Sequence, residues 1–174
     1  MANSGYAFEH ETSTSLRAIP DTFVLKLVDT HLLQGFAYCA NCESRITEDR
    51  KFRGNLILPR QPSDFLVVRA GKPFFIECKS SRNTVSYNIE YIAVHQLEYA
   101  FEVEKVGAMS WFVLNKRKPR EMEAWALRPG ELAEIIANMK TKAAVRWTTI
   151  AQVGRPLEHD TKDKMWQGWE ALLH

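Results

Sequence analysis

The chain has 174 residues, of which 45% are apolar and 25% are charged, and this composition predicts one globular domain with an adequate hydrophobic core. Its net charge of +2 neither requires nor excludes a nucleic-acid partner, so local clusters of basic residues must decide that question. Because no stretch approaches the roughly 20 apolar residues of a membrane span and the first residues lack the pattern of a signal peptide, we expect an intracellular, cytoplasmic protein without membrane contact, encoded by a cell or a virus.

The first residues predict one helix, followed by a segment of ambiguous type. A helix is expected over about Tyr6–Arg17, before Pro20, although its apolar pattern is weak. Segment Phe23–Val28 is rich in residues that favour strands. It also continues as a helical pattern through Asp29–Gln34, and periodicity does not decide between the two.

Two polar patterns follow. Cys39 and Cys42 form a CxxC with the spacing of half a zinc site, but no second CxxC accompanies it and only His31 lies nearby, so a zinc or redox role is the less favoured interpretation. The total of three cysteines, with Cys78, argues against a disulfide framework. The charged segment Glu43–Arg53 predicts a solvated loop or surface helix, or alternatively a basic projection that contacts DNA phosphates.

Two short apolar segments, Asp64–Arg69 and Pro73–Lys79, predict a β-hairpin. Gly71 supplies the residue that a tight turn between them favours. If the loop has two or four residues, Arg69 pairs with Lys72 or Val68 pairs with Pro73, and both pairings give the hairpin the same register.

In that register, charged residues gather on one face of the hairpin. Asp64 lies directly opposite Glu77, and Lys79 shares their face because it is two positions further along the strand. Cys78 points to the other face and is expected in the core. A loop of three residues would instead place Asp64 opposite Cys78.

Two facing carboxylates repel each other unless a proton or a cation lies between them. Their hard oxygen atoms, completed by water and phosphate oxygens, suit Mg²⁺, for which Mn²⁺ would substitute. The ammonium of Lys79 could orient an attacking water or offset negative charge in a transition state. The alternative is an exposed cross-strand salt bridge, which would contribute little to stability.

After the hairpin, the pattern predicts a strand–helix–strand unit. A polar loop with Arg82 leads to a helix over about Ile89–Lys105, which Gly107 ends. Ser110–Leu114 has the length of a buried strand, so it should lie parallel to Pro73–Lys79 in one sheet.

The densest basic cluster is Asn115–Arg120, which contains Lys116, Arg117 and Lys118. Pro119 predicts a turn here. A solvated loop is the default interpretation, and contact with DNA phosphates is the functional alternative.

The last third predicts further short elements and a helical tail. They are a strand over Glu123–Leu127, a helix over Glu131–Met139, an edge strand over Trp147–Ile150, a boundary at Gly154–Pro156 and a helix over His159–His174. We therefore expect one domain over residues 1–154 and a C-terminal tail helix within residues 155–174, packed on the same domain or on a partner subunit.

The hairpin sequence resembles the PD-(D/E)xK nuclease signature. Pro62-Ser63-Asp64 and Glu77-Cys78-Lys79 match its two halves, and their separation is similar to that in Holliday junction resolvases of the archaeal Hjc and bacterial RecU types. The opening Gly5–Glu9 and the segment Val94–Leu97 are also similar to these resolvases. Residues 43–58 lie where RecU-type enzymes carry an inserted protrusion.

This resemblance implies an α/β, restriction-endonuclease-like fold with a mixed central sheet flanked by helices. It also implies a Mg²⁺-dependent, homodimeric endonuclease that resolves four-way DNA junctions by symmetric phosphodiester hydrolysis. The implied metal ligands are Asp64, Glu77, Glu9 in preference to Glu11, and the backbone carbonyl of Cys78. The implied catalytic residues are Glu9, Asp64, Glu77, Lys79 and Gln96, and the expected DNA contacts are Arg53, Arg82, Lys116, Arg117 and Lys118.

Two other functions stay open at this stage. One is a different PD-(D/E)xK nuclease, of the end-processing or restriction type. The other is a DNA-binding module that keeps the fold without catalysis, which the intact Asp64, Glu77 and Lys79 disfavour.

Overall fold

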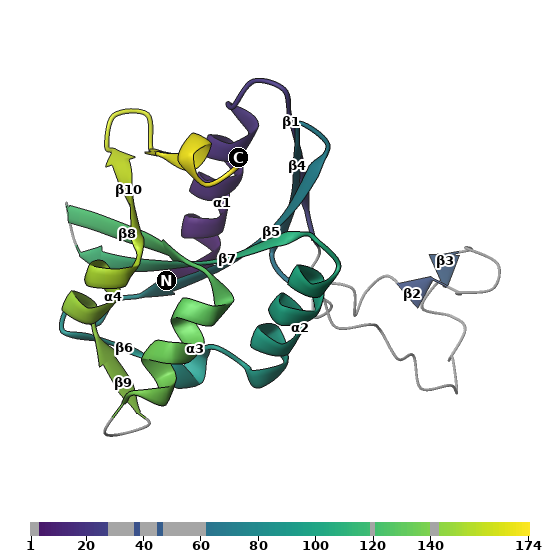
Figure 1. Ribbon diagram of the computed structural model, residues 1–174. Helices are drawn as coiled ribbons and strands as arrows, with labels where there is room; N and C mark the ends of the chain where they lie inside the picture. Colours follow the sequence, from purple (N-terminus) through teal and green to yellow (C-terminus); the bar gives the residue numbers. More distant parts are fainter. Residues whose placement is uncertain (1–3, 28–36, 39–44, 47–61, 119–120, 140–142) are drawn as a thin grey trace.

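A mixed β-sheet with helices on both faces forms the centre of the molecule (Figure 1). The structure is a computed structural model that describes residues 4–27, 37–38, 45–46, 62–118, 121–139 and 143–174. Its seven strands are β1 (Thr22–Lys26), β4 (Phe65–Arg69), β5 (Lys72–Ser81), β7 (Met109–Lys118), β8 (Glu121–Leu127), β10 (Arg155–Asp160) and β11 (Met165–Gln167). Their order across the sheet is β1-β4-β5-β7-β8-β10-β11.

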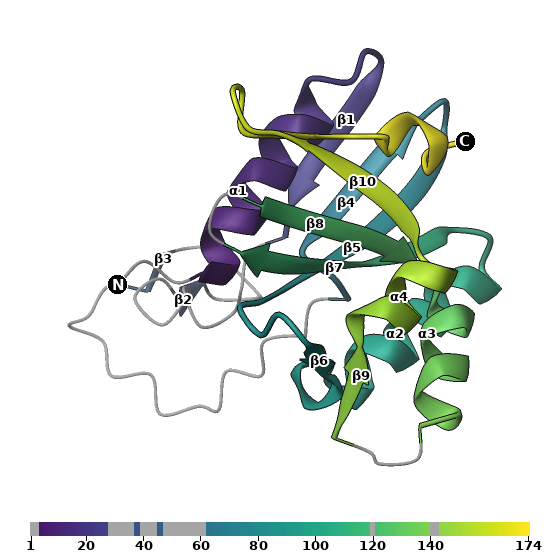
Figure 2. The same ribbon diagram turned by 90° about the vertical axis from the view of Figure 1, so that its left-hand side faces the viewer.

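The helices divide between the two faces of this sheet. Helix α1 (Ser4–Arg17) lies on one face beside the C-terminal segment, which ends in the 3₁₀ turn η3 (Trp169–Ala171) (Figure 2). The other face carries α2 (Val94–Lys105), α3 (Pro129–Ala137) and α4 (Trp147–Val153). The remaining elements are the 3₁₀ turn η2 (Ile89–Tyr91) and the strand pairs β2 (Ala37–Tyr38) with β3 (Arg45–Ile46) and β6 (Ser86–Asn88) with β9 (Ala144–Arg146).

The hairpin of β4 and β5 has the predicted short loop. Ala70 and Gly71 form its two-residue turn, and both have positive φ angles, of 49° and 76°. This is the backbone shape of a type I′ turn, whose twist matches that of antiparallel strands. Arg69 therefore pairs with Lys72, and the predicted register is confirmed.

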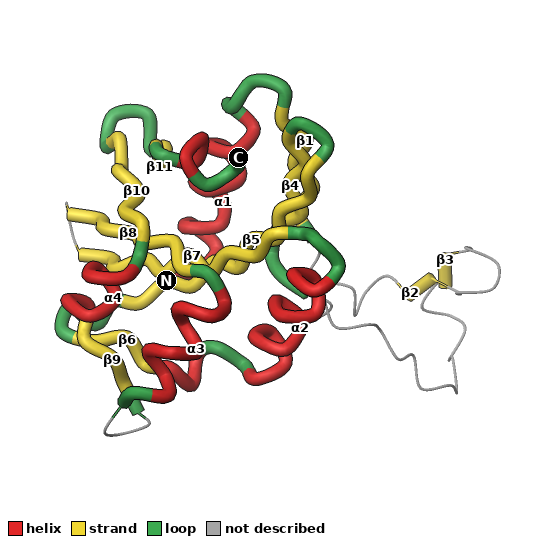
Figure 3. Tube along the Cα trace, in the orientation of Figure 1, coloured by secondary structure: helices red, strands yellow, loops and turns green. Residues whose placement is uncertain are grey.

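The predicted strand–helix–strand unit is also confirmed. Strands β5 and β7 run parallel, and α2 connects them on one face of the sheet (Figure 3). The predicted helix over Ile89–Lys105 is split, because η2 and a short extended segment precede α2. Gly107, with φ of 88°, follows the end of α2 and turns the chain into β7.

The sheet separates two hydrophobic cores. Under α1, the side chains of Phe8 and Trp166 pack edge to face, with ring centroids 5.5 Å apart. The second core lies between the sheet and α2, α3 and α4, and it includes the buried rings of Tyr87 and Trp147. Cys78 is buried in the first core, as predicted. The expected α/β architecture, a mixed sheet flanked by helices, is confirmed.

The C-terminal segment is not the predicted helix. Strand β10 pairs with β8 and β11 pairs with β10, so the segment extends the central sheet. The Asp160 carboxylate accepts hydrogen bonds from the backbone N–H groups of Lys162 and Asp163, which makes a tight turn where the helix was expected. Trp166 in β11 and Trp169 in η3 are both buried in the core, although they do not lie on one helix.

The basic cluster at 115–118 is a strand and not the predicted turn. Strand β7 continues to Lys118, which pairs with Glu121 at the start of β8. Cross-strand contact between Lys116 and Glu123, whose side chains are 2.6 Å apart, favours this extension. Residues 119–120, where Pro119 predicts a turn, lie outside the described residues.

The predicted edge strand over Trp147–Ile150 is helix α4. The Trp147 indole N–H donates a hydrogen bond to the carbonyl of Asn83 at 2.7 Å. Its ring also packs against Tyr87 and Trp125, with centroids 5.5 and 5.7 Å away. This tertiary packing overrides the strand preference of the local sequence, and the strand of this region is β9, just before the helix.

Several predictions concern residues outside the described ranges. They are the CxxC of Cys39 and Cys42, the contact of Arg53 with DNA and the greater part of the insertion at 43–58. Among the described helices, none combines the length and apolar character needed to cross a membrane.

Gly154, between α4 and β10, tests this packing. A Cβ at this position would lie 2.8 Å from the Cβ of Trp125 and 3.0 Å from the carbonyl oxygen of Ile150. We expect Gly154→Ala to lower the free energy of unfolding by about 1–3 kcal/mol, because the crowded atoms must shift. Urea unfolding followed by tryptophan fluorescence measures this change.

Gly130→Ala is the matched control, because a Cβ at Gly130, near the start of α3, meets no atom within 4 Å. It should leave stability unchanged or raise it slightly. Equal stability of the two variants would contradict the packing described around Gly154.

Candidate active site

The backbone of Asp64 is fixed between two strands. Its N–H donates to the carbonyl of Ile76 at 3.1 Å, and its carbonyl accepts from the N–H of Leu27 at 2.8 Å. The regular pairing of β4 with β5 begins at Phe65 and Ile76, and Asp64 precedes it. The Asp64 backbone bonds to Ile76 and its carboxylate to the N–H of Cys78, so Asp64 lies beside the segment that carries Glu77.

The two carboxylates have different partners. An oxygen of Asp64, Oδ2, accepts a hydrogen bond from the backbone N–H of Cys78 at 2.7 Å. The Oε1 oxygen of Glu77 contacts the Lys79 ammonium at 2.7 Å and accepts a short hydrogen bond from the side-chain amide of Gln96. Each of these contacts engages one oxygen of its carboxylate.

Burial makes this pair of acids electrostatically unusual. Glu77 is only 3% exposed, which makes its ionised form costly. Burial, followed by repulsion from Glu77, raises the pKa of Asp64 to about 8. Burial also raises the pKa of Glu77, although the Lys79 ammonium opposes that shift. The site thus favours a proton, or a cation in its place, between the two acids.

Lys26 joins the site, and the sequence patterns did not identify it. At the end of β1, its ammonium lies 2.8 Å from the Oε2 oxygen of Glu9 in α1. Glu9 and then Asp64 act on it to raise the Lys26 pKa, against the opposing effect of burial. The available signal was a single basic residue closing an otherwise apolar strand, which is too common to predict a site.

The structure separates Glu9 from its competitor Glu11. The Glu9 carboxylate contributes to the raised pKa values of both Asp64 and Glu77, so it lies near enough to interact with them. Glu11 points elsewhere, with Oε1 3.5 Å from Arg117 and Oε2 3.8 Å from His159. Of the two, Glu9 is the one whose charge acts on Asp64 and Glu77.

Gln96 connects α2 to the carboxylate pair. Its side-chain oxygen accepts from the N–H of Ala93 at 3.1 Å, which caps the first turn of the helix, while its amide donates to Glu77. One side chain therefore fixes both the helix start and the orientation of the buried acid. His95 stacks edge-on against Tyr99, with centroids 6.2 Å apart, and forms no described contact with the pair.

The basic residues predicted to contact DNA have different environments. Lys116 is largely buried and paired with Glu123 at 2.6 Å, and Arg117 contacts Glu11. Lys118 lies at the end of β7. Arg82 is exposed in the loop after β5, three residues beyond Lys79.

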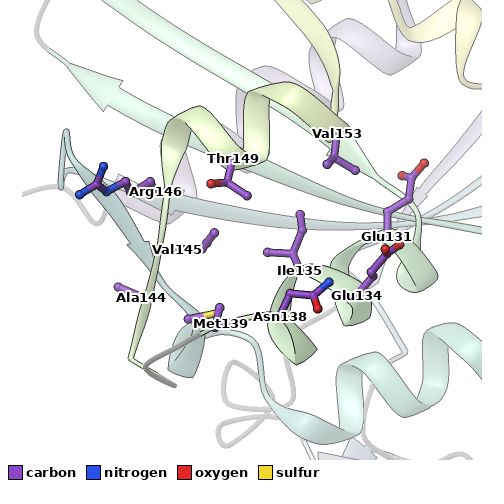
Figure 4. A pocket seen from close by; sticks show the side chains of 10 residues that line it. All are labelled: Glu131, Glu134, Ile135, Asn138, Met139, Ala144, Val145, Arg146, Thr149 and Val153. Carbon is purple, nitrogen blue, oxygen red and sulfur yellow. The ribbon is translucent and has the colours of Figure 1, made fainter.

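A pocket of the described surface lies away from these residues. It has a volume of about 790 Å³ and is lined by side chains from α3, β9 and α4 (Figure 4). Glu131 on its rim is held by the guanidinium of Arg155 through two contacts of 2.7 and 2.9 Å. None of the predicted site residues lines this pocket, so it is separate from the carboxylate pair.

Metal-ligand geometry is incomplete in the described part of the chain, where no three His, Cys, Asp or Glu side chains gather closely enough to hold a metal ion. The Asp64 carboxylate is bonded to the N–H of Cys78, next to Glu77, whereas Glu9 is engaged by Lys26. Asp64 and Glu77 are therefore the centre of the candidate site.

The raised pKa of Asp64 predicts a pH-dependent stability in metal-free buffer. The unfolded carboxyl ionises near its ordinary pKa of 3.8, and the folded one near pH 8, so ionisation opposes folding as the pH rises through this window. Asp64→Asn retains an acceptor for the Cys78 N–H and cannot ionise. The free energy of unfolding of Asp64→Asn, relative to that of the wild type, should increase by a few kcal/mol, in order of magnitude, between about pH 5 and about pH 9.

Urea unfolding in EDTA across this pH range measures the difference. Glu102→Gln is the control, because the Glu102 side chain is 64% exposed and pairs only with Lys105 at the surface. That variant should show a constant difference from the wild type. A constant difference for Asp64→Asn as well would contradict the electrostatics of the pair.

Comparison with known proteins supports the fold. The sequence matches no protein-family model and no curated protein sequence. Among solved structures, the fold is similar to that of Hjc, a Holliday junction resolvase from the archaeal hyperthermophile Archaeoglobus fulgidus, with a TM-score of 0.50. The match covers 86% of this chain and 93% of that chain at 11% sequence identity. This likeness confirms the restriction-endonuclease-like fold expected from the sequence.

Proposed function

We propose that this protein is a Mg²⁺-dependent endonuclease that resolves four-way DNA junctions by hydrolysing phosphodiester bonds. The observation that carries the proposal is the neighbouring pair of acids, with the Asp64 carboxylate 2.7 Å from the N–H of Cys78 and the Lys79 ammonium 2.7 Å from Glu77. The likeness of the fold to a Holliday junction resolvase favours the junction as substrate. Symmetric cleavage of two strands would require a homodimer, because each chain has one such site.

The chemistry of the donor set fits a divalent cation. The raised pKa values of Asp64 and Glu77 show that their ionised forms lack a sufficient counter-charge, which a dication would supply in place of a proton. Asp64 and Glu77, with Glu9 and the carbonyl of Cys78, are the residues that would hold it, and oxygen ligands of this kind suit Mg²⁺ or Mn²⁺. When bound, the ion would acidify a water molecule and polarise the scissile phosphate.

The chain's own residues prepare the site for that chemistry. Gln96 and the Cys78 N–H fix the orientation of one carboxylate each, which limits their reorganisation during a reaction. The ammonium of Lys79 is held beside Glu77 and would stabilise the additional negative charge on the phosphate oxygens. Lys26 offsets the charge of Glu9.

The first test is cleavage of a four-way junction. We expect Mg²⁺-dependent cutting near the branch point, abolished by EDTA, with linear duplex of the same sequence cut far more slowly. Asp64→Asn and Lys79→Met should each reduce the cleavage rate by about 100-fold or more while junction binding persists, because they remove charge that acts on the reacting phosphate. Lys105→Met, which breaks a surface ion pair on α2, is the control.

Full cleavage by purified Asp64→Asn would contradict the assignment of the carboxylate pair. Equal rates on linear duplex and junction would instead indicate an end-processing or restriction-type nuclease. Junction binding without cleavage in either Mg²⁺ or Mn²⁺ would indicate a non-catalytic DNA-binding module.

The second test measures the cation without substrate. Mg²⁺ that binds the folded chain should raise its melting temperature in proportion to occupancy, because ligands that bind only the folded state stabilise it. We expect a clear increase for the wild type at millimolar Mg²⁺ and little or none for Asp64→Asn. An identical increase in both would place the ion elsewhere.

A further inference from the structure

A second, smaller pocket begins directly beside Lys79. It has a volume of about 460 Å³ and is lined by Ser80, Ser81, Arg82, Asn83 and Tyr91. Because these residues follow Lys79 along the end of β5, the pocket continues the candidate site at one edge of the sheet. At about 3.3 Å per residue, Arg82 lies on the order of 10 Å from Lys79 along the chain.

The floor of this pocket is held by hydrogen bonds to neighbouring elements. The Ser80 hydroxyl donates to the side-chain oxygen of Asn115 at 2.9 Å, and the Asn83 carbonyl accepts from the Trp147 indole at 2.7 Å. The side chain of Asn83 accepts from the N–H groups of Val85 and Ser86 at 2.9 and 3.2 Å. These bonds give the loop a defined shape before any ligand arrives.

Tyr91 supplies an aromatic wall that is open to solvent. The residue is 57% exposed, although its ring contacts the fully buried ring of Tyr87 edge-on, with centroids 6.0 Å apart. The Asn88 side chain caps η2 by accepting from the N–H of Glu90 at 3.0 Å, which fixes the turn that carries Tyr91. The ring is thus oriented by the protein and available for stacking.

Arg82 supplies the positive charge. It is exposed, and within the described part of the chain it forms no ion pair. A guanidinium beside an aromatic ring combines the two groups that bind a nucleotide, because the first contacts a phosphate and the second stacks on a base.

We propose that this pocket binds one nucleotide that leaves its base pair at the branch point, next to the cleaved bond, with its base on Tyr91 and its phosphate at Arg82. The assignment rests on the proposed nuclease function and names the part of the substrate that adjoins the site. A base within a continuous duplex is stacked on both sides, so only an unstacked base can present a face to Tyr91. The pocket therefore favours branched DNA over linear duplex.

The experiment uses Asp64→Asn as the parent, so that DNA binds without being cut. Four-way junctions carry the fluorescent base 2-aminopurine, one position at a time, at the nucleotides flanking the cleavage position mapped with the wild type. Binding of the parent should quench one of these positions by stacking. Adding Tyr91→Leu should abolish that quench and weaken junction binding about tenfold.

Matched variants separate stacking from general effects on the fold. Tyr91→Phe keeps the ring and should restore both the quench and the affinity, whereas Tyr99→Leu, which removes an exposed ring on α2 outside the pocket, should change neither. Arg82→Gln should weaken binding and reduce the salt dependence of the binding constant by about one charge.

Two outcomes would overturn the pocket assignment, and only the second would also overturn the proposed nuclease function. If Tyr91→Leu binds the junction with the affinity and fluorescence of the parent while the wild type still cleaves, the pocket assignment fails and the nuclease function stands. If the parent binds no DNA and the wild type cuts none, the proposed function fails and the nucleotide pocket fails with it.

Discussion

The juxtaposition of Asp64 and Glu77 is the constraint on which the structure of the site depends. Neither acid is stable in its buried position without partners, because an ionised carboxylate loses solvation there. The partners come from distant parts of the chain: the Lys79 ammonium from β5, the Gln96 amide from α2, and the Lys26–Glu9 ion pair that joins β1 to α1. The fold is what brings these groups to one edge of the sheet.

The position of β5 in the sheet explains how it can carry this charge. It is hydrogen-bonded to β4 on one side and to β7 on the other, with a hydrophobic core on each face (Figures 1 and 2). Because β5 is hydrogen-bonded on both sides and packed on both faces, its backbone cannot shift to separate the acids, as an edge strand could. The same strand then leads from Lys79 to Arg82, so chemistry and substrate contact follow each other along one backbone.

The sequence was sufficient where the determinants are local. The turn at Ala70-Gly71 follows from a glycine between two apolar runs, and it fixes the register from Arg69 and Lys72 to Phe65 and Ile76, just before Asp64 and Glu77. Lys26 could not be predicted, because its role arises only when β1 pairs with β4 beside α1. The prediction of a helix in the tail was wrong, because the chain makes a turn at Asp160. The spacing of the apolar residues also suits a strand followed by a 3₁₀ turn, which is what the structure shows.

The central claim is that these two acids share one divalent cation, and anomalous X-ray scattering from crystals grown with Mn²⁺ tests it most directly. The account predicts an anomalous peak within coordinating distance of both the Asp64 and the Glu77 carboxylates. A peak bound to neither residue, or the two carboxylates pointing apart with no ion between them at saturating Mn²⁺, would contradict it.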